Sequence, residues 1–215
     1  LWRGLEVSKE IVLCTDMHVT DRSNTFKLGL WGGAGVTGDF KEFDYYVSAS
    51  KFGFTFAVWD IYNFSPGATY NNSQVFNYEA DETGHFIDVS LTYRFPEAFP
   101  LGVSWATVVF GRDRGELNDK NRYSTYVSMD YPIVRNKKVD VDLGIAGAFA
   151  LSKGKNEAGE KIDNHFYGKS AGIVNVNVTF SKVLTFGNYR LPVSAMAMWN
   201  PEGNYANIQL ALNLF

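Results

Sequence analysis

Histidine and acidic side chains are the groups in this sequence that could support catalysis. The 3 histidines are His18, His85 and His165. On a β-strand, Asp16 and His18 would share one face, because alternate side chains point the same way. Nucleophilic catalysis would also need a serine or another nucleophile beside the imidazole and an orienting group, and no nucleophile motif is present. We therefore expect no enzyme, and keep a barrel enzyme acting on lipid as an alternative.

The other two histidines raise the question of a metal site. His85 follows Asp81 and Glu82, and His165 follows Asp163. Imidazole and carboxylate groups are common ligands, but this spacing matches no strong ligand pattern. We expect no metal and no cofactor.

A larger set of polar residues recurs at every second position. In residues 138–151, Val141, Leu143 and Ile145 alternate with Asp142 and Gly144. This period of two is typical of a β-strand with one apolar and one polar or small face, whereas a helix would form no apolar face from this pattern. Similar rows contain Asp16, His18, Lys27, Trp31, Glu42, Asp44, Tyr46, Trp59, Asp88, Arg94, Arg122, Asp130, Asp140, Asp142, Asn175, Asn177 and Gln209.

These rows could line a pore, or could only cross-link the walls of a barrel through internal salt bridges. Acidic groups outnumber basic groups in the rows, so a pore would mildly favour cations. A sharper hypothesis is a constriction of opposed charges near the long-loop ends of the strands. The alternative is a solvated loop cluster. The residues concerned are Arg112, Arg114, Arg122, Glu42, Asp44 and Asp60.

The gap 62–84 could present aromatic platforms to a glycan or a partner protein, or could fold into the mouth of a barrel. A loop packed on itself is the interpretation that we favour, because long loops often pack in this way. The candidate binding residues are Tyr62, Phe64, Tyr70, Phe76 and Tyr78.

The alternating segments predict about twelve strands. They cover residues 1–7, 10–20, 25–34, 42–50, 54–59, 87–94, 101–110, 122–131, 138–151, 173–180, 191–199 and 207–214. Short turns alternate with gaps that are long and polar at 62–84, 112–121 and 152–164, although the gaps at Gly35 and Asn200 are not long. Short turns on one side and long loops on the other are the asymmetry of outer-membrane barrels with both termini on the periplasmic side. The prediction is an all-β chain forming a transmembrane antiparallel up-and-down β-barrel, with residues 1–215 as a single domain.

Composition agrees with strands and limits the classes of function. Aromatic residues make up 16% of the sequence, with Gly 20 and Pro 6, and the net charge is −3. No basic tract is present, so nucleic acid is not an expected partner. Cys14 is the only cysteine, which rules out an intrachain disulfide. No apolar run approaches the roughly 20 residues of a membrane helix, although barrel strands remain possible.

Three features favour lipid on the outside over a soluble barrel or sandwich. The polar rows are often small, the apolar rows are nearly free of charge, and aromatic residues cluster near strand ends as in interfacial girdles. The aromatic residues are Trp2, Phe43, Tyr45, Tyr93, Tyr123, Tyr131, Phe180 and Trp199. Phe215 also gives the chain an aromatic last residue, which is common in outer-membrane proteins.

Several segments carry a resemblance to known families. The element 1–4 (LWRG) resembles the aromatic-Arg-Gly element of small TorF-like porins. The segments 40–47 (FKEFDYYV), 58–66 (VWDIYNFSP), 83–86 (TGHF), 109–115 (VFGRDRG) and 196–201 (MAMWNP) are similar to an outer-membrane barrel family of Bacteroidota-type bacteria. This resemblance implies a barrel in the outer membrane of a Gram-negative bacterium with a channel role, and it carries no substrate.

We expect a small channel for passive diffusion of ions or small polar solutes, with outer-membrane lipid around it. The main alternative is a non-conducting barrel that serves as a structural or docking subunit, with a protein partner bound through its rim loops.

Overall fold

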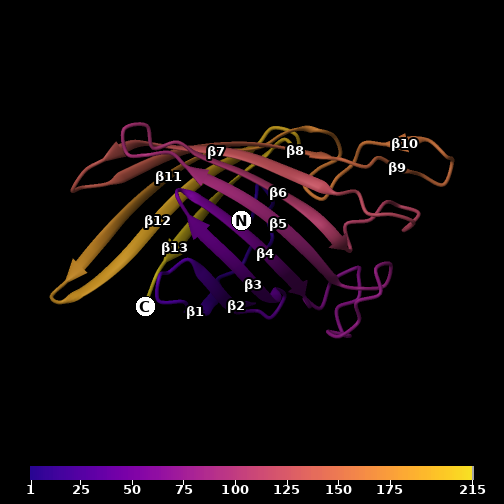
Figure 1. Ribbon diagram of the computed structural model, residues 1–215, viewed down its shortest axis with the longest axis horizontal. Helices are drawn as coiled ribbons and strands as arrows, with labels where there is room; N and C mark the ends of the chain where they lie inside the picture. The colour runs from indigo at the N-terminus through magenta and orange to yellow at the C-terminus, as the bar shows by residue number, and fades with distance from the viewer. Residues whose placement is uncertain (215) are drawn as a thin grey trace.

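The computed structural model describes residues 1–214, and these residues form strands, turns and loops without a helix. One antiparallel sheet contains 11 strands in the order β1-β2-β3-β4-β5-β6-β7-β8-β11-β12-β13 (Figure 1). The strands are β1 (Val12–Thr20), β2 (Phe26–Gly35), β3 (Lys41–Lys51), β4 (Phe54–Asn63), β5 (His85–Arg94), β6 (Gly102–Gly111), β7 (Ser124–Arg135), β8 (Asp140–Ala150), β11 (Gly172–Phe186), β12 (Tyr189–Asn200) and β13 (Tyr205–Leu212). The all-β antiparallel class predicted from the sequence is confirmed.

A second, two-stranded sheet lies within the gap after β8. It pairs β9 (Gly154–Lys155) with β10 (Lys161–Ile162), in a segment that the sequence predicted to be a polar loop. Phe215, with its aromatic side chain, lies outside the described residues.

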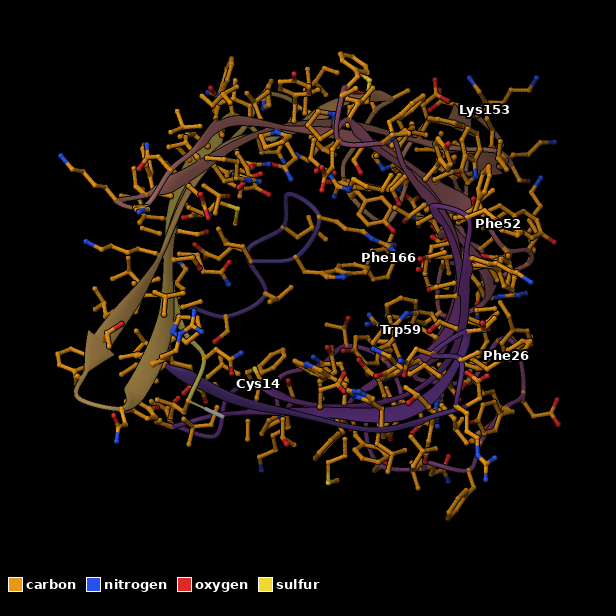
Figure 2. All side chains as sticks on the ribbon, turned by 60° about the vertical axis from the view of Figure 1, so that its left-hand side comes forward. Cys14, Phe26, Phe52, Trp59, Lys153 and Phe166 are labelled. Carbon is orange, nitrogen blue, oxygen red and sulfur yellow. The ribbon has the colours of Figure 1, made fainter. Side chains whose placement is uncertain are left out.

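The large sheet curves around a central space (Figure 2). Trp59 points toward this space, whereas Phe26 points away from it. The strand register carries the inward face from strand to strand, because directly paired residues point to the same side of a sheet. The inward row runs, for example, through the pairs Asp16–Trp31, Trp31–Asp44 and Tyr46–Trp59.

The outward face carries large apolar side chains. Exposed fractions reach 66% for Leu13, 68% for Val19, 77% for Ile208 and 76% for Leu210. The inward face carries the small and polar rows, so the period-two pattern of the sequence corresponds to the two faces of one sheet.

The three longest connections, 64–84, 112–123 and 151–171, all lie at one end of the sheet, whereas 36–40 and 201–204 at that end are as short as the turns at the other end. The turn end contains segments 21–25, 52–53, 95–101, 136–139 and 187–188, and the loop end contains segments 36–40, 64–84, 112–123, 151–171 and 201–204. This alternation agrees with the sequence prediction. Because the number of strands is odd, β1 begins at the loop end whereas β13 finishes at the turn end. The prediction that both termini lie on the short-turn side is therefore wrong, since residues 1–7 do not form the twelfth strand that it required.

The predicted first strand, residues 1–7, is wrong. Trp2 and Leu5 form a single antiparallel bridge, with positive φ at Arg3 (47°) and Gly4 (84°). These angles close a tight turn, which we call the N-terminal turn (Trp2–Leu5), and part of the N-terminal segment lies inside the curved sheet (Figure 2). Trp2 therefore packs in the interior, not in an aromatic belt.

Candidate functional site

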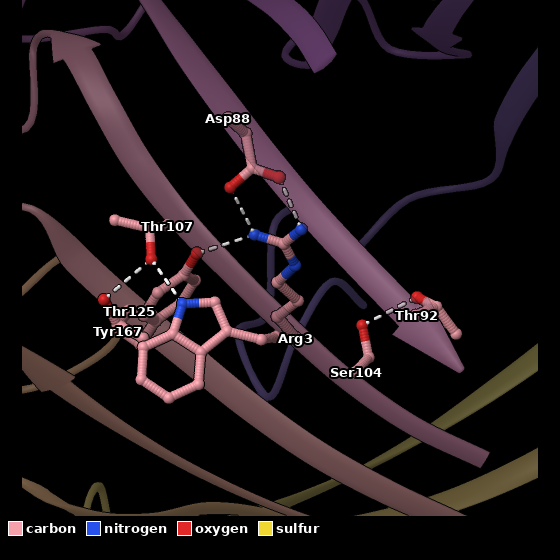
Figure 3. A network of polar contacts seen from close by, with 8 residues as sticks. Arg3, Asp88, Thr92, Ser104, Thr107, Thr125 and Tyr167 are labelled. Carbon is pink, nitrogen blue, oxygen red and sulfur yellow. Dashed lines mark hydrogen bonds and ion pairs between the residues drawn. The ribbon is translucent and has the colours of Figure 1, made fainter. Parts of the chain in front are cut away.

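The N-terminal turn is held in the interior by an ion pair. Arg3 Nη1 and Nη2 donate to the two carboxylate oxygens of Asp88 on β5, at 2.7 and 2.6 Å (Figure 3). Nη1 also donates to the hydroxyl of Tyr167 at 2.8 Å. Burial alone would lower the pKa of Arg3, but the hydrogen bond to Asp88 and the charge of that carboxylate raise it above the ordinary arginine value. The guanidinium is therefore always charged.

Aromatic rings surround the same turn. The Trp2 ring lies 5.9 Å from those of Phe86 and Phe166 and 5.7 Å from that of Tyr167. Phe86 belongs to β5, whereas Phe166 and Tyr167 belong to the loop after β10. Tyr167 is only 1% exposed, so this contact closes off the interior between the sheet wall and that loop.

The far side of the turn is fixed through Gly4. Its carbonyl oxygen accepts hydrogen bonds from Asn200 Nδ2 at 3.1 Å and from the Tyr205 hydroxyl at 2.7 Å. A Cβ at Gly4 would lie 2.2 Å from the carbonyl oxygen of Val174, so only glycine fits here. The turn thus spans the interior from β5 to β11, β12 and β13, near the loop end.

A second cluster lies at the same end around Arg112. Its guanidinium carbon is 3.9 Å from the Tyr70 ring centroid, 4.8 Å from that of Phe86 and 5.2 Å from that of Phe166. Burial lowers the pKa of Arg112, and the nearby charges of Glu42 and Asp44 act in the opposite direction. Arg112 Nε and Asp44 Oδ1 are buried without a hydrogen-bond partner within residues 1–214.

The structure brings together three of the six residues predicted for a charged constriction: Arg112, Glu42 and Asp44. Arg114 instead bonds within its own loop, to Asn118. Asp60 is paired opposite Tyr45 and therefore lies on the outward face, away from Asp44.

Arg122 lies in the loop before β7, outside the strand rows in which it was predicted. Its amide donates to the Asp113 carbonyl oxygen at 2.8 Å. The Asp113 carboxylate in turn accepts from the amide and hydroxyl of Ser124, both at 2.7 Å. Burial raises the pKa of Asp113, although these bonds partly offset it.

The segment 64–84 packs around His85. The imidazole lies between the rings of Tyr62 and Tyr78, with centroid distances of 4.3 and 4.4 Å. Its Nδ1 faces Asp60 Oδ1 at 2.7 Å and its Nε2 faces the Val75 carbonyl oxygen at 2.7 Å.

The aromatic residues proposed to bind a glycan or partner are therefore mostly used within the loop itself. Phe64 stacks on Tyr62 at 6.0 Å, Tyr70 covers Arg112, and Phe76 remains 87% exposed. The carboxylate that His85 contacts belongs to Asp60 on β4, not to Asp81 or Glu82, the acidic residues considered with it for a metal site. His165 Nε2 faces the carbonyl oxygen of Ser170, not the Asp163 carboxylate.

Toward the turn end, the interior is lined by polar side chains in ion pairs and hydrogen bonds. Arg94 pairs with Asp130, and Arg135 pairs with Asp142, at 2.5 Å each. A cavity of about 330 Å³ lies against β7, β8 and β11. Its polar lining comprises Tyr126, Ser128, Asp130, Asp142, Asn175, Asn177 and Thr179.

The first two strands contribute a further polar group. Asp16 lies 2.6 Å from His18 Nδ1, and both its carboxylate oxygens accept from the Tyr46 hydroxyl at 3.0 Å. The Tyr46 ring stacks on Trp59 at 4.1 Å. No serine takes part in these contacts of His18.

The strand register places the other residues of the predicted polar row on the inward face. Lys27 of β2 pairs with Thr20 of β1 and with Ser48 of β3, and all three point inward. Gln209 of β13 pairs with Met196 of β12, two residues along from the pair of Asn207 and Met198. Asp140 is paired with Ser181 at the turn end. The inward face therefore holds all of that row except Arg122.

Sequence reasoning missed the interior position of Trp2 and Arg3, as well as the partners of Asp88 and Arg112. No local sequence pattern predicts these contacts, because Arg3 and Asp88 lie 85 residues apart and Phe166 contacts Arg112 from a different loop. The available signal was a single charged residue within a strand, such as Asp88. A buried carboxylate needs a cation close to it in space, even when that cation is far away in the sequence.

Comparison with known proteins adds no assignment: no protein-family model, curated protein or solved structure matches the chain. In residues 1–214, no group of three or more His, Cys, Asp and Glu side chains is arranged to hold a metal ion. No helix long and apolar enough to cross a membrane occurs in the same range.

Proposed function

We propose that this protein is a small outer-membrane channel that admits ions or small polar solutes and is narrowed at its loop end by the N-terminal turn. The observation that carries this proposal is the difference between the two faces of one curved sheet, which is apolar on the outside and polar or small on the inside. Residues such as Ile208 and Leu210 are more than three-quarters exposed on the outward face, at 77% and 76%. A continuous apolar outer surface of this kind is costly in water and is matched by lipid.

The interior supports passage of polar solutes more than storage of an apolar ligand. Carboxylates, amides and hydroxyls from the inward rows line its cavity, beside Gly144 and the apolar residues Met129, Leu143 and Ile145. Ion pairing of Asp88, Asp130 and Asp142 with arginines offsets much of the acidic excess of the row. We therefore propose a weak cation preference, set by the acidic groups that remain.

Conductance in a planar bilayer tests the channel. We expect small steps from the wild-type protein, because Trp2, Arg3 and Phe166 narrow the loop end. The double substitution Trp2→Ala and Arg3→Ala should raise the unitary conductance several-fold, since it removes the aromatic ring and the guanidinium from the interior. A reversal potential under a salt gradient measures the cation preference.

A substitution in the same segment provides the control. The Lys9 side chain is 84% exposed, and among residues 1–214 its ion pair is with Glu6. Lys9→Ala therefore removes a positive charge at the surface and leaves the interior unchanged. Its conductance should equal that of the wild type. If the folded double variant remains silent in the bilayer, the channel proposal is wrong.

One observation favours a second candidate function, a non-conducting docking barrel in an outer-membrane complex. The contacts among Trp2, Phe86, Phe166 and Tyr167 fill part of the interior at the loop end with packed aromatic rings. For this candidate, Phe76, exposed at the rim, is the first residue to probe for a partner by photocrosslinking.

A further inference from the structure

The large sheet has two unpaired edges, β1 and β13. Throughout residues 1–214, no Cα atom of β1 lies within 8 Å of one in β13. Paired strands are about 4.8 Å apart, so edges that flank one missing strand would be about 9.6 Å apart. Exposed strand edges present unpaired backbone groups that are prone to recruit another strand.

Strand direction limits what can fill this seam. Every neighbouring pair in the sheet is antiparallel, so the first and eleventh strands run the same way. Direct closure of β1 on β13 would therefore need a parallel pair. One strand running from the turn end to the loop end would form antiparallel pairs with both edges and would complete an even-numbered barrel.

A second copy of this chain fits the seam poorly. This step rests on the proposed membrane location, because all copies would then share one orientation. Both edges of every copy would run from the loop end to the turn end, so contacts between copies would pair parallel strands. The occupant must run in the opposite direction.

The side chains on either side define the chemistry of the occupant. Its outward row would lie between Leu13 of β1 and Ile208 and Leu210 of β13, which are 66%, 77% and 76% exposed. Its inward row would lie between the polar groups of Asp16 and Gln209, which occupy the inward faces of their strands. We propose that the seam binds a single extended polypeptide segment of alternating apolar and small or polar residues, which pairs antiparallel with β1 and β13. Its length would match the 9 residues of β1 and the 8 residues of β13.

The strand β8 provides a probe. It already runs from the turn end to the loop end between two strands of the opposite direction, and its inward positions are small or acidic. A synthetic peptide with the sequence of 140–150, DVDLGIAGAFA, therefore has the required direction and alternation. A series of such peptides would carry one cysteine each, at successive inward or outward positions.

The detergent-folded 215-residue protein is mixed with each peptide in air with copper–phenanthroline, so that oxygen takes up the two electrons released when two thiols join as a disulfide. It reacts through its only cysteine, Cys14, which is exposed on β1 and lies on the inward face two residues before Asp16. We expect disulfide adducts to form about tenfold faster at one or two inward positions than with a permuted peptide that lacks alternation, because a seated strand raises the local thiol concentration. Outward cysteines should react no faster than the permuted control.

Three results would overturn the proposal. The first is an equal rate for all peptides, including the permuted one. The second is a Cys14–Cys14 disulfide between two protein chains that forms faster than any peptide adduct. The third is an intramolecular disulfide in the Gln209→Cys variant, which would mean that β1 and β13 pair directly. Since adducts are read on a gel without a bilayer, failure here is distinguishable from failure of the channel proposal.

Discussion

Arg3 and Asp88 form a bidentate ion pair in the interior, with nitrogen–oxygen distances of 2.7 and 2.6 Å. The carboxylate is 1% exposed at its side chain, whereas the guanidinium is 18% exposed. The pair therefore connects the N-terminal turn to the middle of the sheet at a place where neither charge could stay alone without cost.

Removal of one partner should be more harmful than removal of both. Arg3→Met leaves the Asp88 carboxylate buried without its cation, and we expect the free energy of unfolding to fall by about 3 kcal/mol. Asp88→Asn should cost less, because Arg3 is the more exposed partner. Urea unfolding of the two single variants and the double variant in lipid vesicles measures the coupling. Additive losses would show that the two charges do not act as a pair.

The contrast between local and distant contacts explains how much the sequence could predict. Strands and faces depend on neighbouring residues, so the alternation in residues 138–151 was sufficient to predict β8 and its inward row. The N-terminal turn depends on contacts far along the chain. Positive φ at Arg3 is unfavourable for its residue type, and tertiary contacts with Asp88 and Tyr167 accompany it.

The candidate site divides in the same way. Glu42, Asp44 and Arg112 could be grouped beforehand, because alternating turns and loops place them at one end of the sheet. The same reasoning wrongly included Asp60, because it considered only position along the strand. Asp60 directly follows the inward Trp59 and therefore points to the outward face. Asp81 and Glu82 were the acidic residues considered with His85 for a metal site, because they are near it in the sequence, but the imidazole bonds to Asp60 from a neighbouring strand.

Acidification should loosen the loop between β2 and β3. Glu10 accepts hydrogen bonds from the hydroxyl and amide of Thr37, and from the amide of Phe40 at 3.0 Å. These bonds favour the carboxylate and lower the pKa of Glu10. A lowered folded-state pKa stabilises the loop above the unfolded-state value of about 4.3, and this contribution is lost as the pH falls through the lower, folded-state pKa.

Amide hydrogen exchange measures this effect. Protection of the Thr37 and Phe40 amides should decrease as the pH falls below about 4.3, after correction for the intrinsic exchange rate. In the Glu10→Gln variant, protection should be weaker at neutral pH and should no longer change in that range. An unchanged pH profile in this variant would assign the effect to another carboxylate.

Gly29 allows the Tyr46 ring to lie flat against the neighbouring strand. A Cβ at Gly29 would lie 2.3 Å from the ring carbon Cζ, and this ring is also stacked on Trp59 and bonded to Asp16. Gly29→Ala must therefore displace a buried aromatic side chain, and we expect a loss of about 1–3 kcal/mol. The matched control is Gly67→Ala, where an added Cβ meets nothing within 4 Å, so its effect should stay within about 0.5 kcal/mol. Denaturant unfolding compares the two variants, and equal losses would contradict the packing explanation.

His85 should control the opening of the segment 64–84. The imidazole is fully buried, is enclosed by Tyr62 and Tyr78, and has an oxygen atom 2.7 Å from each ring nitrogen. His85→Ala removes both bonds and the ring contacts, so local opening of the segment should become easier. Each 1.4 kcal/mol lost would accelerate limited chymotrypsin cleavage at Phe76 about tenfold, provided that opening precedes cleavage. His165→Ala is the control, since this histidine bonds to Ser170 in a different loop and should leave cleavage at Phe76 unchanged. Equal cleavage rates in the wild type and His85→Ala would mean that Tyr62 and the backbone hold the segment without the imidazole.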